Sequence, residues 1–312
     1  MHVERFRPID SLKAGAGHPP IRGVQDLAAH GEVDRSVFFS VHGSPPKGFK
    51  TQVKILFIGD IVGSPGRKIV HDRLADIISQ RGVDLCIANG ENSASGFGIT
   101  PRLAEEIFAA GAEVITGGNH IWDRKEIFDF FPHEPRLIRP ANFPEGSPGK
   151  GHYVGTAKNG VAYAVMNLQG RTFMTPLEDP FRAAERELAA IPTGVKVIVV
   201  DMHAEATSEK QAMGWFLDGK VSAVLGTHTH VATADNHVLP RGTAYITDVG
   251  MTGPHDSVIG MEKEPIVQRF LDSMPKKFVV AENDIQMNTV QIDVDETTGL
   301  ARSIERVNFR LD

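Results

Sequence analysis

The sequence predicts an α/β domain whose central strands are parallel. Short apolar runs alternate with amphipathic helical stretches along the first part of the chain, which is the pattern of strand–helix units. Several of these apolar runs are followed at once by polar residues of the types that bind metal ions. The last part of the chain is rich in strand-forming residues. With 312 residues, the chain is long enough to bury a sizeable core.

The sequence gives the approximate ends of the first strand and the first two helices. Residues 53–58 form an apolar run that predicts a buried strand ending just before Asp60. A helix should follow over residues 65–79, since its apolar residues recur on one side. Thr100 and Pro101 predict the start of a second helix, because threonine caps helix N-termini and proline is tolerated in the first turn.

The remaining elements complete the strand–helix units and add a β-rich C-terminal part. Further strands are expected at residues 84–88, 113–116, 162–167, 195–200, 223–225, 244–247, 285–294 and 301–308. Further helices are expected at residues 181–190 and 208–216. A turn over residues 295–299 should join the last two strands as a hairpin.

The N-terminal residues differ from the rest of the chain. Residues 1–52 contain scattered Gly, Pro, His and charged residues without a helical or strand period, which predicts a disordered extension. A second interpretation is that this stretch is not native and that translation begins at Val53. Both interpretations leave residues 53–312 as one domain.

Composition limits the classes of function. Lys and Arg number 33 and Asp and Glu number 39, a net charge of −6, so binding to duplex nucleic acid is not expected. A small phosphate ester could still bind if metal cations supplied positive charge locally. Cys86 is the single cysteine, which excludes an internal disulfide and fits the cytoplasm. No apolar run is long enough to cross a membrane. A homo-oligomer remains open.

Metal-binding residue types gather after the predicted strands. The carboxyl ends of strands in an open α/β sheet are where ligands bind, so these side chains should converge. Oxygen and imidazole ligands together suit manganese, iron or zinc, and the set is too large for one ion but sensible for two. The candidate metal ligands are Asp60, Glu91, Asn92, Asn119, His203, His228 and His230.

Each of these residues has a plainer interpretation when taken alone. Asp60 could be a helix cap, Glu91 could be a solvated loop residue, and His203 could be a core histidine. His228 and His230 are the stronger pair, because an extended backbone would place both imidazoles on one side. Taken together, the residues predict a binuclear metal site.

The ordered motifs resemble those of the calcineurin-like metallophosphoesterases. Residues 57–63, 88–96 and 118–123 are similar more narrowly to the YmdB-like bacterial branch, which hydrolyses 2′,3′-cyclic nucleotides. The resemblance covers residues 53–312. It implies a β-sandwich of two mixed sheets flanked by helices, and attack of a metal-bridging hydroxide on a small nucleotide phosphodiester.

The resemblance also implies roles for single residues. Asp60 and His230 would bind a first metal with Asn92 nearby, while Asn119, His203 and His228 would bind a second and Glu91 would bridge. The catalytic residue His120 would protonate the leaving oxygen or stabilise charge on the phosphoryl group, with Asp123 orienting it.

Two positions depart from the wider superfamily. Val62 stands where an imidazole ligand is usual, and Glu91 stands where an aspartate is usual. One nitrogen ligand fewer favours iron or manganese, with zinc still open. The alternatives are a phosphomonoesterase or 5′-nucleotidase of the same fold, and a non-catalytic regulatory protein that senses a nucleotide or an RNA end.

Overall fold

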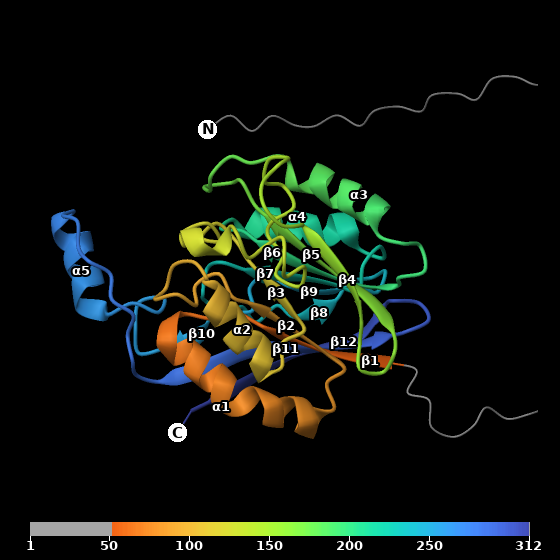
Figure 1. Ribbon diagram of the computed structural model, residues 1–312, viewed down its shortest axis with the longest axis horizontal. Coiled ribbons are helices and arrows are strands. Elements are labelled where there is room, and N and C mark those ends of the chain that lie inside the picture. The colour runs from red at the N-terminus through yellow and green to blue at the C-terminus, as the bar shows by residue number, and fades with distance from the viewer. Residues whose placement is uncertain (1–51, 312) are drawn as a thin grey trace, which may run out of the picture. The chain divides into compact units, whose positions relative to one another are not determined.

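The computed structural model describes residues 52–311 (Figure 1). The prediction of a disordered or non-native extension at residues 1–52 lies outside the described residues, except for Gln52. That residue already belongs to the first strand, β1.

The first sheet is mixed. It contains β1 (Gln52–Ile58), β2 (Leu85–Asn89), β3 (Val114–Thr116), β10 (Thr252–Pro254), β11 (Ile285–Asp295) and β12 (Ala301–Arg310). Strands β1, β2 and β3 run parallel in that order. Strands β10 and β1 pair antiparallel with one edge of β11, and β12 pairs antiparallel with the other edge as the predicted hairpin.

The second sheet is also mixed. Its order is β4 (His152–Thr156), β5 (Ala162–Gln169), β6 (Val197–His203), β7 (Ala223–Thr227), β9 (Ala244–Ile246) and β8 (His237–Val238). Strands β5, β6, β7 and β9 are parallel, and the two edge strands are antiparallel to their neighbours.

Strand β1 explains why the apolar runs are continuous rather than alternating. Val53, Ile55 and Phe57 pack in the core between the two sheets. Leu56 and Ile58 point the other way, into a core under the helices. A strand buried on both faces needs apolar residues at successive positions.

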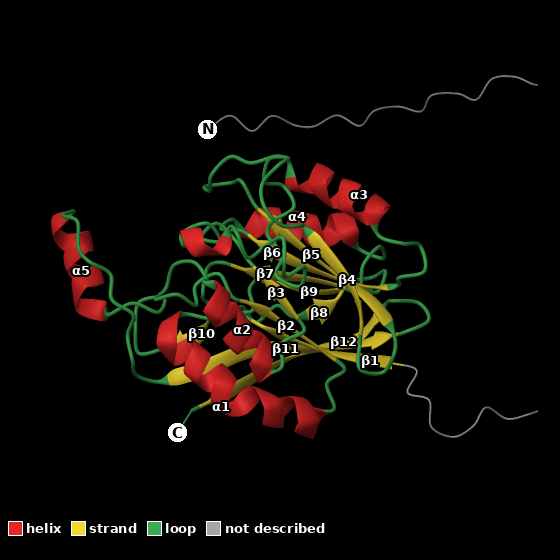
Figure 2. Cartoon of the chain, in the orientation of Figure 1, coloured by secondary structure: helices red, strands yellow, loops and turns green. Residues whose placement is uncertain are grey.

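Helices cover the outer face of each sheet, as Figure 2 shows. Helices α1 (Gly63–Arg81) and α2 (Pro101–Ala110) pack on the first sheet. Helices α3 (Pro180–Ala190) and α4 (Thr207–Leu217) pack on the second. This helix–sheet–sheet–helix arrangement confirms the predicted fold class.

Several elements were not expected. The strands β4, β8 and β10, a short 3-10 helix at Lys125–Ile127 and helix α5 (Lys263–Asp272) follow no pattern that sequence reasoning recognised. The unpredicted strands are short or lie at sheet edges, and α5 buries only Ile266. Among the described residues, no helix has the length and apolar character to cross a membrane.

Candidate metal centre

The predicted ligands come from both sheets. Those carrying oxygen atoms follow strands of the first sheet: Asp60 after β1, Glu91 and Asn92 after β2, and Asn119 after β3. The imidazoles belong to the second sheet, with His203 ending β6 and His228 and His230 following β7. All of them belong to one network of contacts at the carboxyl ends of the parallel strands.

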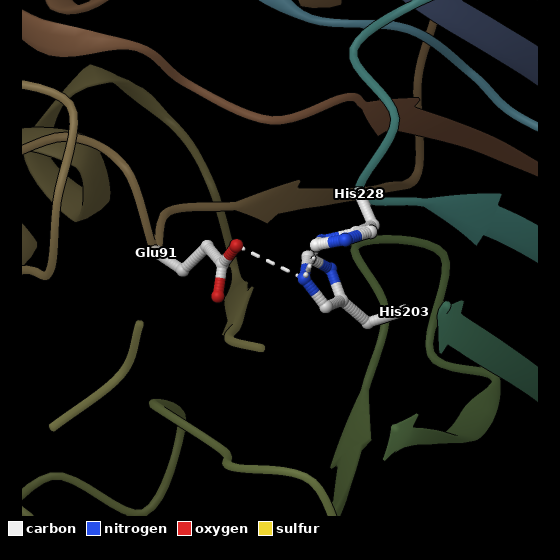
Figure 3. A group of neighbouring side chains, drawn as sticks. All are labelled: Glu91, His203 and His228. Atoms are coloured by element: carbon white, nitrogen blue, oxygen red, sulfur yellow. Dashed lines mark hydrogen bonds and ion pairs between the residues drawn. The ribbon is translucent and has the colours of Figure 1, made fainter. Parts of the chain in front are cut away.

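Ligand atoms crowd around one ring nitrogen of His203. Its Nε2 lies 3.0 Å from Oε1 of Glu91 and 3.0 Å from Nδ1 of His228 (Figure 3). The same nitrogen lies 2.9 Å from Oδ1 of Asn119. A single N–H can serve only one of these atoms well. Glu91, His203 and His228 together offer ligand atoms within 4.8 Å of one another, a spacing that a metal ion could occupy.

Burial has left two oxygen atoms in this network without partners. Oδ1 of Asp60 and Oδ1 of Asn92 are buried and accept no hydrogen bond from any described residue. Buried polar atoms are nearly always paired, so unpaired oxygens point to a missing group. A cation beside these oxygens fits both their chemistry and their lack of a donor.

The remaining contacts join Asp60, Asn92 and His230 to the cluster. Oδ2 of Asp60 accepts the backbone N–H of His228 at 3.2 Å. The amide of Asn92 donates to Nε2 of His230 at 3.1 Å, while Nδ1 of His230 donates to the carbonyl of Ile259 at 2.9 Å. The second contact fixes which ring nitrogen of His230 faces the cluster.

The backbone around His228 and His230 differs from the expectation. Their φ angles are 100° and 66°, so the segment is not extended, and the reason given for their alignment is wrong. The turn that contains His228 and His230 is instead stabilised by Asp248. Its Oδ2 accepts hydrogen bonds from the backbone N–H and the hydroxyl of Thr229 at 3.1 and 2.8 Å. Positive φ in non-glycine residues is strained and occurs often at functional sites.

Sequence reasoning missed the buried residues that orient His203. Nδ1 of His203 donates to Oγ1 of Thr227 at 2.9 Å, because that hydroxyl itself donates to Oδ1 of Asp201 at 2.7 Å. These hydrogen bonds keep a proton on Nδ1 of His203, so that Nε2, which faces Glu91, is the ring nitrogen that could bind a metal. Asp201 precedes His203 by two positions in the same strand, and this spacing was the available signal.

Glu205 was also missed. Its Oε2 lies 3.2 Å from Nε2 of His228, on the side of that ring away from His203. Its position two residues after His203 in the chain gave no motif that could have identified it.

Electrostatic coupling within the cluster is strong. Burial acts to raise the pKa of Glu91, but the charges and hydrogen bonds of His203 and His120 together outweigh burial and bring the pKa down to about 2. Burial acts to lower the pKa of His203, but the carboxylates of Glu91, Asp60 and Asp201 together raise it to about 9. Burial and the charge of His203 lower the pKa of His228 to about 3. Without a cation, a proton on His203 therefore balances the carboxylate, and a bound cation would take over that role.

His120 lies at the rim of the cluster. Its backbone N–H donates to Oε2 of Glu91 at 3.0 Å, and Nδ1 of its ring lies 2.8 Å from Oδ2 of Asp123. The ring of Phe97 packs edge-on against it at 5.1 Å. His120 lines a cavity of about 510 Å³ that also contains Glu91, so the imidazole faces the space that a substrate would occupy.

Comparison with known proteins gives the family. The sequence model of the YmdB-like protein family matches residues 56–307. The chain is 53% identical over 256 residues to the 2′,3′-cyclic-nucleotide 2′-phosphodiesterase of Bacillus subtilis, covering 82% of this chain and 96% of that protein. A Thermus thermophilus hypothetical protein has a similar structure, with a TM-score of 0.79 and 40% sequence identity. The match covers 83% of this chain and 100% of that protein. The structure of a Mycoplasma pneumoniae phosphatase is also similar, with a TM-score of 0.79 and 34% sequence identity. The match covers 84% of this chain and 94% of that protein. The chain therefore belongs to the YmdB-like family.

Proposed function

We propose that this chain is a metal-dependent phosphodiesterase that hydrolyses 2′,3′-cyclic nucleotides. The observation that carries the proposal is the convergence of the predicted ligands in one network of contacts, beside a cavity lined by Glu91, His228 and His120. The activity in the name of the Bacillus subtilis relative supports the same substrate class. The buried lone cysteine, Cys86, agrees with a cytoplasmic location.

The residues of the cluster fit two cations. Asp60 and His230, with Asn92 nearby, would hold one, while Asn119, His203 and His228 would hold the other and Glu91 would be shared. This donor set suits iron or manganese, and zinc is compatible. When bound, the cations would neutralise charge on the phosphate oxygens and lower the pKa of a water ligand.

The chain itself supplies the proton for the leaving group. The contact with Asp123 keeps the Nδ1 proton of His120 in place and leaves Nε2 directed away from that carboxylate. Protonated His120 can then donate from Nε2 to the departing ribose oxygen. Opening the ring at the 2′ bond would release a nucleoside 3′-phosphate with a free 2′ hydroxyl.

Metal-loaded protein tests the proposal directly. The protein should be stripped of metal and reloaded with manganese or iron, then incubated with 2′,3′-cyclic AMP, 3′,5′-cyclic AMP and AMP. We expect hydrolysis of the 2′,3′-cyclic nucleotide, and none in a chelated sample. Hydrolysis of AMP alone would instead identify a phosphomonoesterase, and binding without turnover would identify a sensing protein.

Substitutions separate metal binding from proton transfer. Glu91→Gln and His228→Ala should lose metal and turnover together. His120→Asn should keep its metal and lose turnover by about 10²–10⁴-fold, the usual contribution of a general acid. His71→Asn is the matched control, because His71 is exposed on α1. Normal turnover by the His120 variant would remove that residue from the mechanism.

A further inference from the structure

The cavity beside the metal centre has a second wall that supplies none of the predicted metal ligands and no catalytic residue. On one side lie Glu91, His120 and His228. On the other lie side chains of a segment that we call the α5 arm, residues 258–281, which projects from the sheets in Figure 1. The volume of about 510 Å³ is within the range of sites that bind molecules of nucleotide size.

The arm is tied to the metal centre at its base. The carbonyl of Ile259 accepts from Nδ1 of His230 at 2.9 Å. Met261 pairs with Val280 in an antiparallel bridge, and the N–H of Glu262 donates to the carbonyl of Val279 at 2.8 Å. These contacts hold the base of the wall at a fixed place relative to a predicted metal ligand.

The chemistry of the wall is that of a stacking platform. The guanidinium carbon of Arg269 lies 5.0 Å from the ring centre of Phe278. Phe270, next along the arm, is 83% exposed. Arg269 makes no ion pair with any other residue in the described part of the chain, so no acid there competes for its charge. Planar guanidinium and aromatic groups are the surfaces on which nucleobases stack.

We propose that the α5 arm is the nucleobase subsite, with the base of the substrate stacked against Arg269 and Phe278. This inference rests on the proposed function, since it names what holds the substrate end remote from the phosphate. The ligand has its cyclic phosphate at the metal cluster and its base on the arm. Because every base has a π-face, such a wall accepts purines and pyrimidines alike.

Binding measurements on metal-loaded protein test the subsite. Arg269→Ala and Phe278→Ala should each weaken binding of 3′-AMP roughly tenfold, the usual effect of removing a side chain on which a base stacks. Binding of inorganic phosphate should be unchanged. The KM for 2′,3′-cyclic AMP should rise by a similar factor at nearly constant kcat, because the lost contact is made equally before and during the reaction. Calorimetry and steady-state kinetics give the two readouts.

The controls use the same helix. Leu271 is 76% exposed and does not line the cavity, so Leu271→Ala should bind 3′-AMP like the parent protein. Arg269 is exposed, so Arg269→Ala should fold normally and can test the subsite even if Phe278→Ala unfolds. Equal losses for phosphate and 3′-AMP, or no loss at all, would overturn the subsite. The subsite would also be overturned if the variants changed the sedimentation coefficient but still bound nucleotide normally, because that result would assign the wall to contact with a second copy of the chain. Failure of the proposed function appears separately, as no turnover by the parent protein.

Discussion

The ammonium of Lys210 lies 2.7 Å from Oδ2 of Asp248, and both side chains are completely buried. Lys210 belongs to α4, whereas Asp248 follows β9 and supports the turn that carries His228 and His230. The pair therefore joins the outer helix of the second sheet to the predicted metal ligands.

Lys210→Met should destabilise the protein strongly. It would leave the Asp248 carboxylate buried without its cation, which costs about 3–5 kcal/mol in comparable pairs. Urea unfolding at neutral pH measures the loss. Lys196→Met, at an exposed position, should change the free energy of unfolding by no more than about 0.5 kcal/mol. If the Lys210→Met/Asp248→Asn double variant were no more stable than Lys210→Met alone, the charge would not be the cause.

Thr227→Val should weaken metal binding without unfolding the protein. Valine has a similar shape but breaks the hydrogen-bond chain from Asp201 to His203, so the Nδ1 proton loses its acceptor and Nε2 is no longer held in place to bind a metal. Loss of such an orienting contact typically costs 10–100-fold in metal affinity, roughly. Equilibrium dialysis with metal analysis gives the affinity. Thr243→Val, which removes a buried hydroxyl bonded to the carbonyl of Val221, should bind metal normally.

Gly118→Ala should disrupt the same centre by crowding. A methyl group there would lie 2.3 Å from Oε2 of Glu91 and 2.4 Å from Nε2 of His203, so both must move. Overpacking of this kind costs about 1–3 kcal/mol, and the displaced ligands should lose metal. Gly194→Ala meets nothing within 4 Å and serves as the control. Full metal content in Gly118→Ala, determined by elemental analysis, would contradict the crowding.

The pair His152–Glu187 should make stability depend on acid pH. Burial acts to raise the pKa of Glu187, but the 2.6 Å hydrogen bond and the charge of His152, together with Arg186, outweigh burial, and the pKa falls below its usual value. A carboxyl group whose pKa is lower in the folded state stabilises the protein above its unfolded pKa, about 4.3. That contribution is lost as pH falls through the folded pKa.

Glu187→Gln should therefore be less stable than the parent at pH 7, with the difference shrinking as pH falls below about 4. Thermal unfolding across this pH range measures it. The exposed Glu185→Gln variant should keep the parental pH profile. A difference that stayed constant with pH would rule out the ion pair as its source.

The parts of the fold that were predictable are those in which burial fixes the sequence. Strand β1 was found because both of its faces are covered, which requires consecutive apolar residues. The hairpin of β11 and β12 was found from the turn residues between them. Helix α5 was missed because its apolar residues, such as Phe270, lie largely outside the core, so no core-facing period marks them. Strand β4, which contains His152, was not predicted because it is only partly buried.

The candidate site was predictable in its residue types but not in its geometry. Strand order places Asp60 and His203 at one end of the domain, and this follows from topology alone. The left-handed backbone of His228 depends on the support from Asp248, which is distant in sequence. The role of Asp201 depends on the hydroxyls of Thr116 and Thr227 in neighbouring strands, and the sequence alone does not give these contacts.

The division of donor atoms between the two sheets has a mechanical consequence. Oxygen donors come from one layer of the sandwich and nitrogen donors from the other, so an ion held by both acts as a noncovalent crosslink between the layers. Any slippage of one layer past the other would open the coordination sphere, and each ion bound would resist that slippage. Loading with metal should therefore raise the melting temperature as the free metal concentration rises above its dissociation constant.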